Sequence, residues 1–445
     1  MAKVDTSPSR GMRDLLPREV AIRDHMTSVI LDTYKEAGFV KIETPAVEDL
    51  DRLVGSGGGE NEKLVFKILK RGEKLDIADE DSLADLGLRF DLTVPLSRYY
   101  AHNFAKLGGS ILRSIQIGPV WRAERPQKGR YRQFVQCDID VIGEASIVAE
   151  LALISTTLRA LKRLGIPSLT LRFNHRALLD QILEFFEIEV GKRSGVLIAL
   201  DKLDKLTSMQ VAQLIIDLGV DEAVATQLIE RMSDLGEGGI VDSDRLKGIG
   251  IAEGVVEDLL AIASMSSDDE FGDVKFVFDP TVIRGMGYYT GPIFELSLPQ
   301  FGFSIGGGGR YDTMLERFGR SAPACGFSIG FERVALYLEE SGFNPLSDAN
   351  VVHIRLSNPS LFTRVANIVA KLRTAKFIVD FDGPNRKADA QLKSYRRQYE
   401  ESGRRGVEAF IDIDDGGTIT ISRVGGAESS IEEIRTLFSD EQPLL

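Results

Sequence analysis

The densest group of chemically active side chains lies in GPVWRAERPQKGRYRQFVQCDID, residues 118–140. Residues 122–132 place five cations beside one acid, Glu124, although the 445-residue chain carries a formal net charge of -13. The cations are Arg122, Arg125, Lys128, Arg130 and Arg132. Arginine offers planar, bidentate donors to phosphate oxygens at any cellular pH, so the stretch predicts a site for a phosphorylated ligand. The alternative is a solvated basic turn without a ligand.

The residues that follow this basic stretch alternate between polar and apolar types. Gln136, Asp138 and Asp140 are separated by single residues, and Ile139 and Val141 fill the apolar positions. This period of two is typical of a β-strand. Since only the short link RPQKGR separates two apolar runs, the sequence predicts an antiparallel hairpin with a basic tip and a row of acids on its second strand.

A second candidate segment is IRGMGYYTGPIFEL, residues 283–296. Arg284 lies between β-branched and glycine residues and precedes Tyr288 and Tyr289. Glycine lets a backbone approach a ligand closely, so the segment would bring a cation and a phenol to a ligand. The alternative is a β-bulge at Gly285 and Gly287 with the tyrosines in the core.

A third candidate segment comprises SIGGGGRYDTMLERFG and ACGFSIGFERV, within residues 304–334. No Lys-Ser/Thr pair follows the glycines 306–309, which disfavours a P-loop. A glycine-lined strand remains, followed by Arg333 at the start of a helix. The alternative for Arg333 is a residue on the helix surface that pairs with Glu332 or a neighbour.

The elements that must position these residues predict an α+β chain. A helix at 18–37 and a strand broken by Pro45 precede the basic stretch, and amphipathic helices fill residues 175–272. Strand patterns return after residue 272, and strands alternate with helices after residue 349. The expected domains are 1–174 with 273–340 as one interrupted domain, 175–272 as a helical insertion, 341–349 as a linker and 350–445 as an α/β domain.

Composition narrows the class of protein further. The chain is 43% hydrophobic, has no apolar run long enough to cross a bilayer and begins without the apolar core of a signal peptide. We therefore expect a cytoplasmic protein without a membrane partner. Cys137 and Cys325 lack the spacing of metal ligands, so neither a disulfide nor a structural metal site is expected.

Together these segments resemble the class II aminoacyl-tRNA synthetases and, within them, the histidyl-tRNA synthetase family. GFVKIETPAVE is similar to the first class motif, WRAERPQKGRYRQFVQCDID to the second and GFSIGFERV to the third. IRGMGYYTG and GGGGRYD resemble two segments peculiar to the histidine enzymes, and RGMRDLLP resembles their opening. One departure is Gly287, where the family commonly has an acid.

The resemblance implies a catalytic antiparallel sheet flanked by helices, which activates histidine with ATP and transfers it to tRNA(His). Arg122 and Arg284 would bind the α-phosphate and act as the catalytic cations. Glu124 would bind the adenine edge and Arg333 the terminal phosphates, with Mg²⁺ bridging phosphate oxygens.

The resemblance also implies how histidine is read. Asp140 would accept from the imidazole, with Tyr288 and Tyr289 beside it. Asp91, Thr93 and Gln136 would face the α-ammonium. The alternative for Asp140 is an ion pair with Arg130 or Arg132.

Two parts of the chain are expected to bind tRNA. Arg125, Gln127 and Lys128 lie at the hairpin tip. Arg396 and Arg397 belong to a basic stretch, residues 384–406, with seven Lys or Arg against three acids, inside the expected C-terminal anticodon-binding domain. A helix with a solvated charged face is the alternative. The first motif, around residues 38–48, is expected to form a homodimer.

Other classes of function remain as alternatives. A catalytically silent paralogue, such as the regulatory subunit of ATP phosphoribosyltransferase, usually lacks the C-terminal domain and the ATP-binding arginines. A tRNA sensor would be fused to a kinase segment, and no such segment accompanies this sequence. Specificity for threonine or proline is opposed by the RGMGYYTG and GGGGRYD segments.

Truncation after residue 345 should keep histidine-dependent pyrophosphate exchange and lose most tRNA charging, because exchange uses only the small substrates. Exchange and charging are measured on the same preparation. Equal charging by the truncated and complete chains would show that residues 384–406 are only a solvated face.

Overall fold

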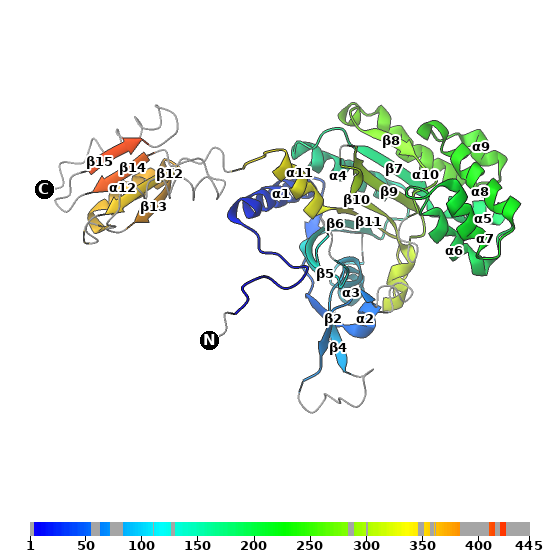
Figure 1. Cartoon of the computed structure of the whole chain (residues 1–445), viewed down its shortest axis with the longest axis horizontal. Helices are drawn as coiled ribbons and strands as arrows, with labels where there is room; N and C mark the ends of the chain where they lie inside the picture. The colour runs from blue at the N-terminus through cyan, green and yellow to red at the C-terminus, as the bar shows by residue number, and fades with distance from the viewer. Residues whose placement is uncertain are drawn as a thin grey trace. The chain divides into compact units, whose positions relative to one another are not determined.

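The computed structural model of the chain forms two compact units, Met1–Arg13 with Thr27–Leu336, and Asp14–Met26 with Tyr337–Leu445 (Figure 1). The structure describes residues 4–54, 63–71, 83–109, 111–125, 130–283, 289–299, 301–345, 351–356, 360, 362–382, 409–413 and 419–423.

An eight-stranded sheet forms the centre of the first unit. In spatial order its strands are β1 (Val40–Lys41), β5 (Leu112–Trp121), β6 (Gln133–Ile142), β11 (Ala324–Ile329), β10 (Phe303–Arg310), β9 (Pro292–Leu298), β7 (Thr170–His175) and β8 (Lys275–Phe278). The six inner strands are antiparallel, whereas β1 pairs with β5, and β8 with β7, in parallel. The expected mixed α+β class is confirmed.

Helices and a smaller sheet complete this part of the chain. The helices are α2 (Leu50–Val54), α3 (Thr93–Asn103) and α4 (Val148–Arg163), with the 3-10 segment η7 (Asp312–Phe318), together with α1 (Pro17–Glu36) from Thr27 onward and α11 (Phe331–Glu340) up to Leu336. The three-stranded sheet has the order β2 (Val47–Asp49), β4 (Ala84–Leu88) and β3 (Lys67–Leu69). The predicted helix at 18–37 is confirmed, and it ends before Gly38, whose φ of 85° suits glycine.

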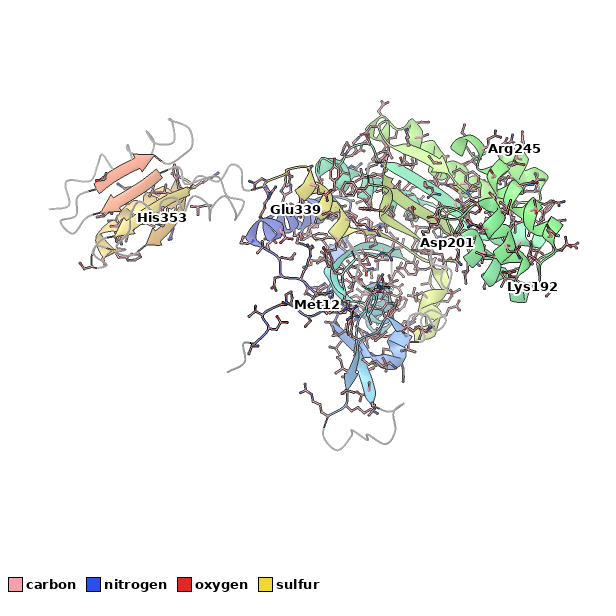
Figure 2. The ribbon with its side chains drawn as sticks, in the orientation of Figure 1. Met12, Lys192, Asp201, Arg245, Glu339 and His353 are labelled. Carbon is pink, nitrogen blue, oxygen red and sulfur yellow. The ribbon has the colours of Figure 1, made fainter. Side chains whose placement is uncertain are left out.

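Helices occupy the segment between β7 and β8, gathered beside the β7 and β8 side of the sheet (Figure 1). They are α5 (Arg176–Phe185), α6 (Val190–Leu200), α7 (Ser208–Ile216), α8 (Glu222–Leu235), α9 (Ser243–Gly248) and α10 (Glu253–Ser264), with η4 (Glu237–Gly239), η5 (Met265–Ser267) and η6 (Asp269–Phe271). Lys192, Asp201 and Arg245 mark this segment in Figure 2. Among the described residues, no helix is both long and apolar enough to span a membrane.

The second unit contains a four-stranded sheet in the order β13 (Ile378–Asp382), β12 (Val351–Leu356), β14 (Ala409–Ile413) and β15 (Ile419–Arg423). The helix α12 (Phe362–Thr374) joins β12 to the parallel β13, as in a βαβ unit. A buried cluster that includes Val352, Ile368 and Ile411 forms its core. The basic stretch 384–406 lies outside the described residues.

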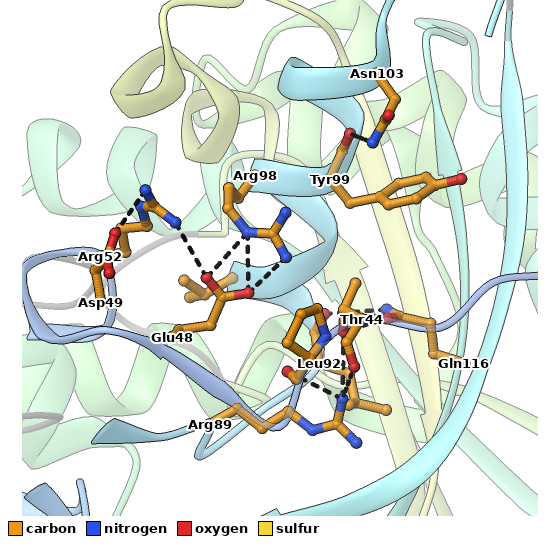
Figure 3. Close-up of polar contacts among 12 residues, drawn as sticks. Thr44, Glu48, Asp49, Arg52, Arg89, Leu92, Arg98, Tyr99, Asn103 and Gln116 are labelled. Atoms are coloured by element: carbon orange, nitrogen blue, oxygen red, sulfur yellow. Dashed lines mark hydrogen bonds and ion pairs between the residues drawn. The ribbon is translucent and has the colours of Figure 1, made fainter. Parts of the chain in front are cut away.

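Buried polar contacts hold β2 and the segment around Pro45, which lies between β1 and β2 (Figure 3). Glu48 is only 4% exposed and accepts from Arg98 of α3, with Nη2 to Oε1 at 2.6 Å, while Arg52 lies 3.4 Å away. Arg89 donates from Nη1 to the backbone oxygen of Thr44 at 2.7 Å. These donors satisfy buried acceptors. The contact with Arg98 therefore holds β2 against α3, and the contact with Arg89 holds the segment that precedes β2.

A second buried ion pair joins β10 to α4. Arg310 meets Glu150 through two hydrogen bonds, Nε to Oε1 at 2.6 Å and Nη2 to Oε2 at 2.7 Å. Glu150 is fully buried, and Arg310 also donates to the backbone oxygens of Glu144 and Ser146. Burial raises the pKa of Glu150, while the guanidinium opposes this rise. The pair holds the end of β10, so it sets the position of the residues that follow it.

Replacing Glu150 by alanine should lower the free energy of unfolding by about 3–5 kcal/mol, because a buried guanidinium loses its partner. Denaturant titration measures the change. Glu270→Ala is the matched control: Arg159 and Glu270 form the same two-bond geometry, at 2.6 and 2.7 Å, but their side chains are 38% and 39% exposed. That exposed pair should contribute about 0–1 kcal/mol. Equal losses in both variants would contradict a role for burial.

Candidate active site

The hairpin predicted from the basic stretch is confirmed. β5 and β6 pair in antiparallel register from Leu112 with Ile142 to Trp121 with Gln133. Arg122 continues the pairing, since its backbone N–H donates to the oxygen of Arg132 at 2.8 Å. The tip includes the exposed Arg125, whereas Gln127 and Lys128 lie outside the described residues. The hairpin therefore carries cations near its tip and acids farther along β6.

A cavity of about 430 Å³ lies beside the tip end of this hairpin. Arg122, Arg130 and Arg333 line it, together with Glu124. Arg122 is restrained by donation from Nε to the oxygen of Phe90 at 2.9 Å, and its guanidinium lies over the ring of Phe134. Three cations in one cavity fit an anionic ligand, and a restrained arginine loses little freedom when it binds one.

Arg333 is also held by neighbouring residues. It donates from Nη1 to the backbone oxygen of Ser304, and its guanidinium lies 5.1 Å from the ring centroid of Phe303. Glu332 faces a different partner, Arg13, at 3.1 Å. The alternative of an Arg333–Glu332 surface pair therefore does not describe this helix start.

The N-terminal segment contacts residues that line the same cavity, which the sequence did not predict. Glu332 accepts from the Nη2 of Arg13 and from the backbone N–H of Val135 at 3.0 Å. Arg13 also lies over the ring of Tyr131, 4.3 Å from its centroid, and Gly11 accepts from the backbone of Arg132 at 2.8 Å. Residues 11–13 thus brace both the hairpin and the start of α11. The RGMRDLLP segment pointed to the family but gave no sign of this contact.

A second cavity of about 50 Å³ lies farther along β6. Its lining includes Gln136, Asp138 and Asp140 from β6, Thr93 from α3, and Tyr289 and Tyr311. Gln136 and Tyr289 line both cavities, so the two cavities adjoin. An anion-binding space and an acidic space therefore meet at shared side chains.

Asp140 makes its hydrogen bond with Tyr311, whose hydroxyl donates to Oδ1 at 2.6 Å. Tyr311 belongs to the GGGGRYD segment, but the sequence alone predicted no role for this residue. The alternative partners do not pair with Asp140 in this way: Arg132 donates instead to the backbone oxygen of Glu124 at 3.1 Å. Gly326 leaves room for the carboxylate, because a Cβ there would lie 2.2 Å from its Oδ1.

Two buried carboxyls, Asp138 and Asp140, line the acidic space, and a third carboxyl, Asp91, lies beside it. Burial raises the pKa of Asp140 to about 7, against the donation from Tyr311. Burial likewise raises the pKa of Asp91 to about 6, against the N–H of Val94. Burial and the charge of Asp140 raise the pKa of Asp138 well above its usual range. A cationic ligand would lower the cost of ionising these groups.

Two residues assigned to the site, Arg284 and Tyr288, lie outside the described residues, as do Arg396 and Arg397. The other residues assigned to the small-molecule site line one or both of the two cavities, except Asp91. Asp91 lies just before α3, where its Oδ1 accepts from the backbone N–H of Val94 at 3.2 Å.

The fold of the chain occurs in known synthetase structures. Histidyl-tRNA synthetase from Nostoc sp. PCC 7120 superposes with a TM-score of 0.75 at 23% identity, covering 98% of this chain and 100% of that chain. An ATP phosphoribosyltransferase regulatory subunit/histidyl-tRNA synthetase from Bacillus halodurans C gives 0.72 at 22% identity, covering 88% and 97%. These similarities show that the chain shares its fold with those structures.

Sequence comparison identifies the family. The family model described as histidyl-tRNA synthetase matches residues 11–334. A histidine–tRNA ligase of Leifsonia xyli subsp. xyli is 46% identical over 347 residues, covering 75% of this chain and 80% of that protein. A probable histidine–tRNA ligase of Tropheryma whipplei is 40% identical over 423 residues, covering 92% and 95%. The chain belongs to the histidyl-tRNA synthetase family.

The raised pKa of Asp140 predicts a pH-dependent stability of the ligand-free protein. A carboxyl with a folded pKa of about 7 and an unfolded value of about 3.9 binds more protons in the folded state, so its contribution to stability is lost as pH rises from about 4 to 7. Asp140→Asn removes this loss. The melting temperature of the variant minus that of the wild type should therefore increase from pH 5 to pH 8.

The control is Asp234→Asn on the exposed surface of α8. Its difference from the wild type should stay level across the same pH range, because water hydrates that carboxyl in the folded and the unfolded chain. If the melting-temperature difference between Asp140→Asn and the wild type also stays constant with pH, this result would contradict a costly buried charge at Asp140.

Proposed function

We propose that the protein is a histidine–tRNA ligase, which activates histidine with ATP and transfers it to the 3′ end of tRNA(His). The observation that carries this function is the meeting of the arginine-lined cavity with the acidic cavity at Gln136 and Tyr289. An amino acid that lies across this junction presents its cationic groups to the acids and its carboxylate to the phosphate side. Family membership supports histidine as that amino acid.

In the first step a carboxylate oxygen of histidine attacks the α-phosphorus of ATP. The bond from that phosphorus to the bridging oxygen breaks, and pyrophosphate leaves with the electron pair. Arg122 neutralises charge at the α-phosphate, assisted by Arg284, while Arg333 binds the terminal phosphates and Glu124 the adenine edge. Fixed cations suit this reaction because they stabilise developing charge without rearranging. No general base is needed, since the carboxylate is already a nucleophile.

Mg²⁺ would add charge neutralisation at the phosphates. Among the residues that the structure describes, no group of three His, Cys, Asp or Glu side chains is arranged to hold a metal ion. In the second step a hydroxyl at the 3′ end of tRNA attacks the adenylate carbonyl, and AMP leaves.

Histidine is read by the acidic cavity. Asp140, oriented by Tyr311, accepts from an imidazole N–H, and Tyr289 lines the same cavity. Tyr288 is the second tyrosine assigned to reading the imidazole. Asp91, Thr93 and Gln136 accept from the α-ammonium. Buried acceptors of this kind reject analogues that cannot satisfy them, because an unpaired polar group costs free energy.

The finer assignments complete the proposal. Residues 175–272 form a helical insertion, and residues 350–445, after the linker 341–349, form the anticodon-binding domain with Arg396 and Arg397 on its basic stretch. Arg125, Gln127 and Lys128 contact the acceptor end of the tRNA. The protein acts in the cytoplasm.

The protein acts as a homodimer through residues 38–48. Support comes from the end strand β1 and from Val40 and Val47, which are 54% and 39% exposed. Sedimentation that finds only a 49.0 kDa species at micromolar concentration would refute the dimer.

Pyrophosphate exchange measured with each of the twenty amino acids tests the function, and histidine alone should support exchange. Asp140→Ala should cost about 1–3 kcal/mol of histidine binding, since it leaves a buried donor unpaired. That loss corresponds to a roughly 5- to 150-fold higher KM for histidine, with a much smaller change for ATP.

Asp180→Ala, on the surface of α5 and paired with Arg176, is the control that should leave both Michaelis constants unchanged. A chain that folds but exchanges with no amino acid would instead support the catalytically silent paralogue. An unaltered histidine KM in Asp140→Ala would remove Asp140 as the imidazole reader.

A further inference from the structure

Asp138 is a buried acid of the smaller cavity that the proposed function leaves without a role. It lies between Gln136 and Asp140 on one face of β6 and is only 4% exposed. A buried carboxyl is costly unless it binds a partner or does chemistry. The contact of Asp138 with Gln136 explains why a carboxyl is buried at this position.

The side-chain amide of Gln136 donates from Nε2 to Oδ2 of Asp138 at 2.7 Å. Once it is ionised, the Asp138 carboxylate can only accept hydrogen bonds, so it then holds the NH₂ end of the amide toward itself. The amide oxygen, Oε1, is then the end that remains for another partner. Oε1 of Gln136 is buried and has no hydrogen-bond partner within the described part of the chain.

A buried carbonyl oxygen without a donor favours a ligand that brings one. Gln136 lines both cavities, so its side chain lies where an amino acid would extend from the acidic space to the arginines. The α-ammonium of an amino acid offers three N–H donors and no acceptor. It can satisfy Oε1 but would be repelled by the NH₂ end of a reversed amide.

The surrounding charges agree with this arrangement. Burial and Asp140 raise the pKa of Asp138, while the hydroxyl of Ser328 and the amide of Gln136 lower it. An ammonium that enters beside Asp91, Asp138 and Asp140 supplies the missing cation and favours their ionised forms. Substrate binding and the ordered amide therefore reinforce each other.

We propose that Asp138 is a positioning residue that holds the Gln136 amide with its carbonyl oxygen toward the α-ammonium of histidine. The inference rests on the proposed function, because it takes an amino acid as the ligand. Asp138 acts through Gln136, so its effect is confined to ligands that carry the amine.

Two probes separate this role from others. Histidinol keeps the amine and the imidazole, whereas imidazole-4-propionate keeps the imidazole and carboxylate but lacks the amine. Affinities of the complete protein are measured by calorimetry and by inhibition of histidine-dependent exchange. In Asp138→Asn the new amide can donate to Oε1 and reverse Gln136. Histidinol affinity should fall about 10- to 100-fold, while imidazole-4-propionate affinity should change less than about twofold.

Gln136→Ala should show the same selectivity, and Asp138→Asn should add no further loss in that background, because both changes remove one shared contact. Thermal melting shows that each variant is folded. Asp138→Asn should fold, because Asn is nearly isosteric with Asp and introduces no buried charge. If Asp138→Asn is nevertheless unstable, Gln136→Ala tests the role of the amide on its own.

Equal losses for both probes would overturn the proposal, since Asp138 would then read the imidazole or shape the cavity. So would unchanged histidinol binding in Asp138→Asn when Gln136→Ala weakens it. Failure of the proposed function is a separate result: the wild-type protein would then show no histidine-dependent exchange and no histidinol binding.

Discussion

Carboxylates can lie inside this sheet only because the neighbouring strands carry glycine. A Cβ at Gly308 would lie 1.9 Å from the backbone oxygen of Gly326, and a Cβ at Gly326 would meet Asp140. Glycine weakens a strand interior, because it loses more conformational freedom on folding and offers no side chain for packing. The glycines therefore lower the stability of the strands but leave room for polar groups. The buried pair of Arg310 and Glu150 holds the end of the same glycine-rich strand.

One strand also separates two kinds of charge. The start of β6 lies beside Arg122 and Arg130, and its later residues carry Asp138 and Asp140. A strand rises about 3.3 Å per residue, so a few residues span the distance between a phosphate and an amino-acid side chain. Because the hairpin is continuous, cations and acids cannot shift independently, and a ligand that fits one end is placed at the other.

Local patterns were sufficient to predict much of this arrangement. Alternation and the short RPQKGR link predicted the β5–β6 hairpin, and the glycine run correctly indicated a strand, β10. The contact of Tyr311 with Asp140 joins residues 171 positions apart, so no local period encodes it. The contact between Arg13 and Glu332 joins residues that are 319 positions apart. Such pairings depend on how strands are ordered in the sheet, which the motifs alone did not reveal.

The brace between Arg13 and Glu332 also sets an order of events during synthesis. Arg13 is synthesised 319 residues before its partner Glu332. At about 5–20 residues per second, that interval is roughly 16–64 seconds. Until Glu332 is made, Arg13 and the hairpin aromatic Tyr131 lack the carboxylate that completes their cluster. The arginine-lined cavity therefore becomes fully braced only after the catalytic sheet has received its last strand, β11, and α11 has begun.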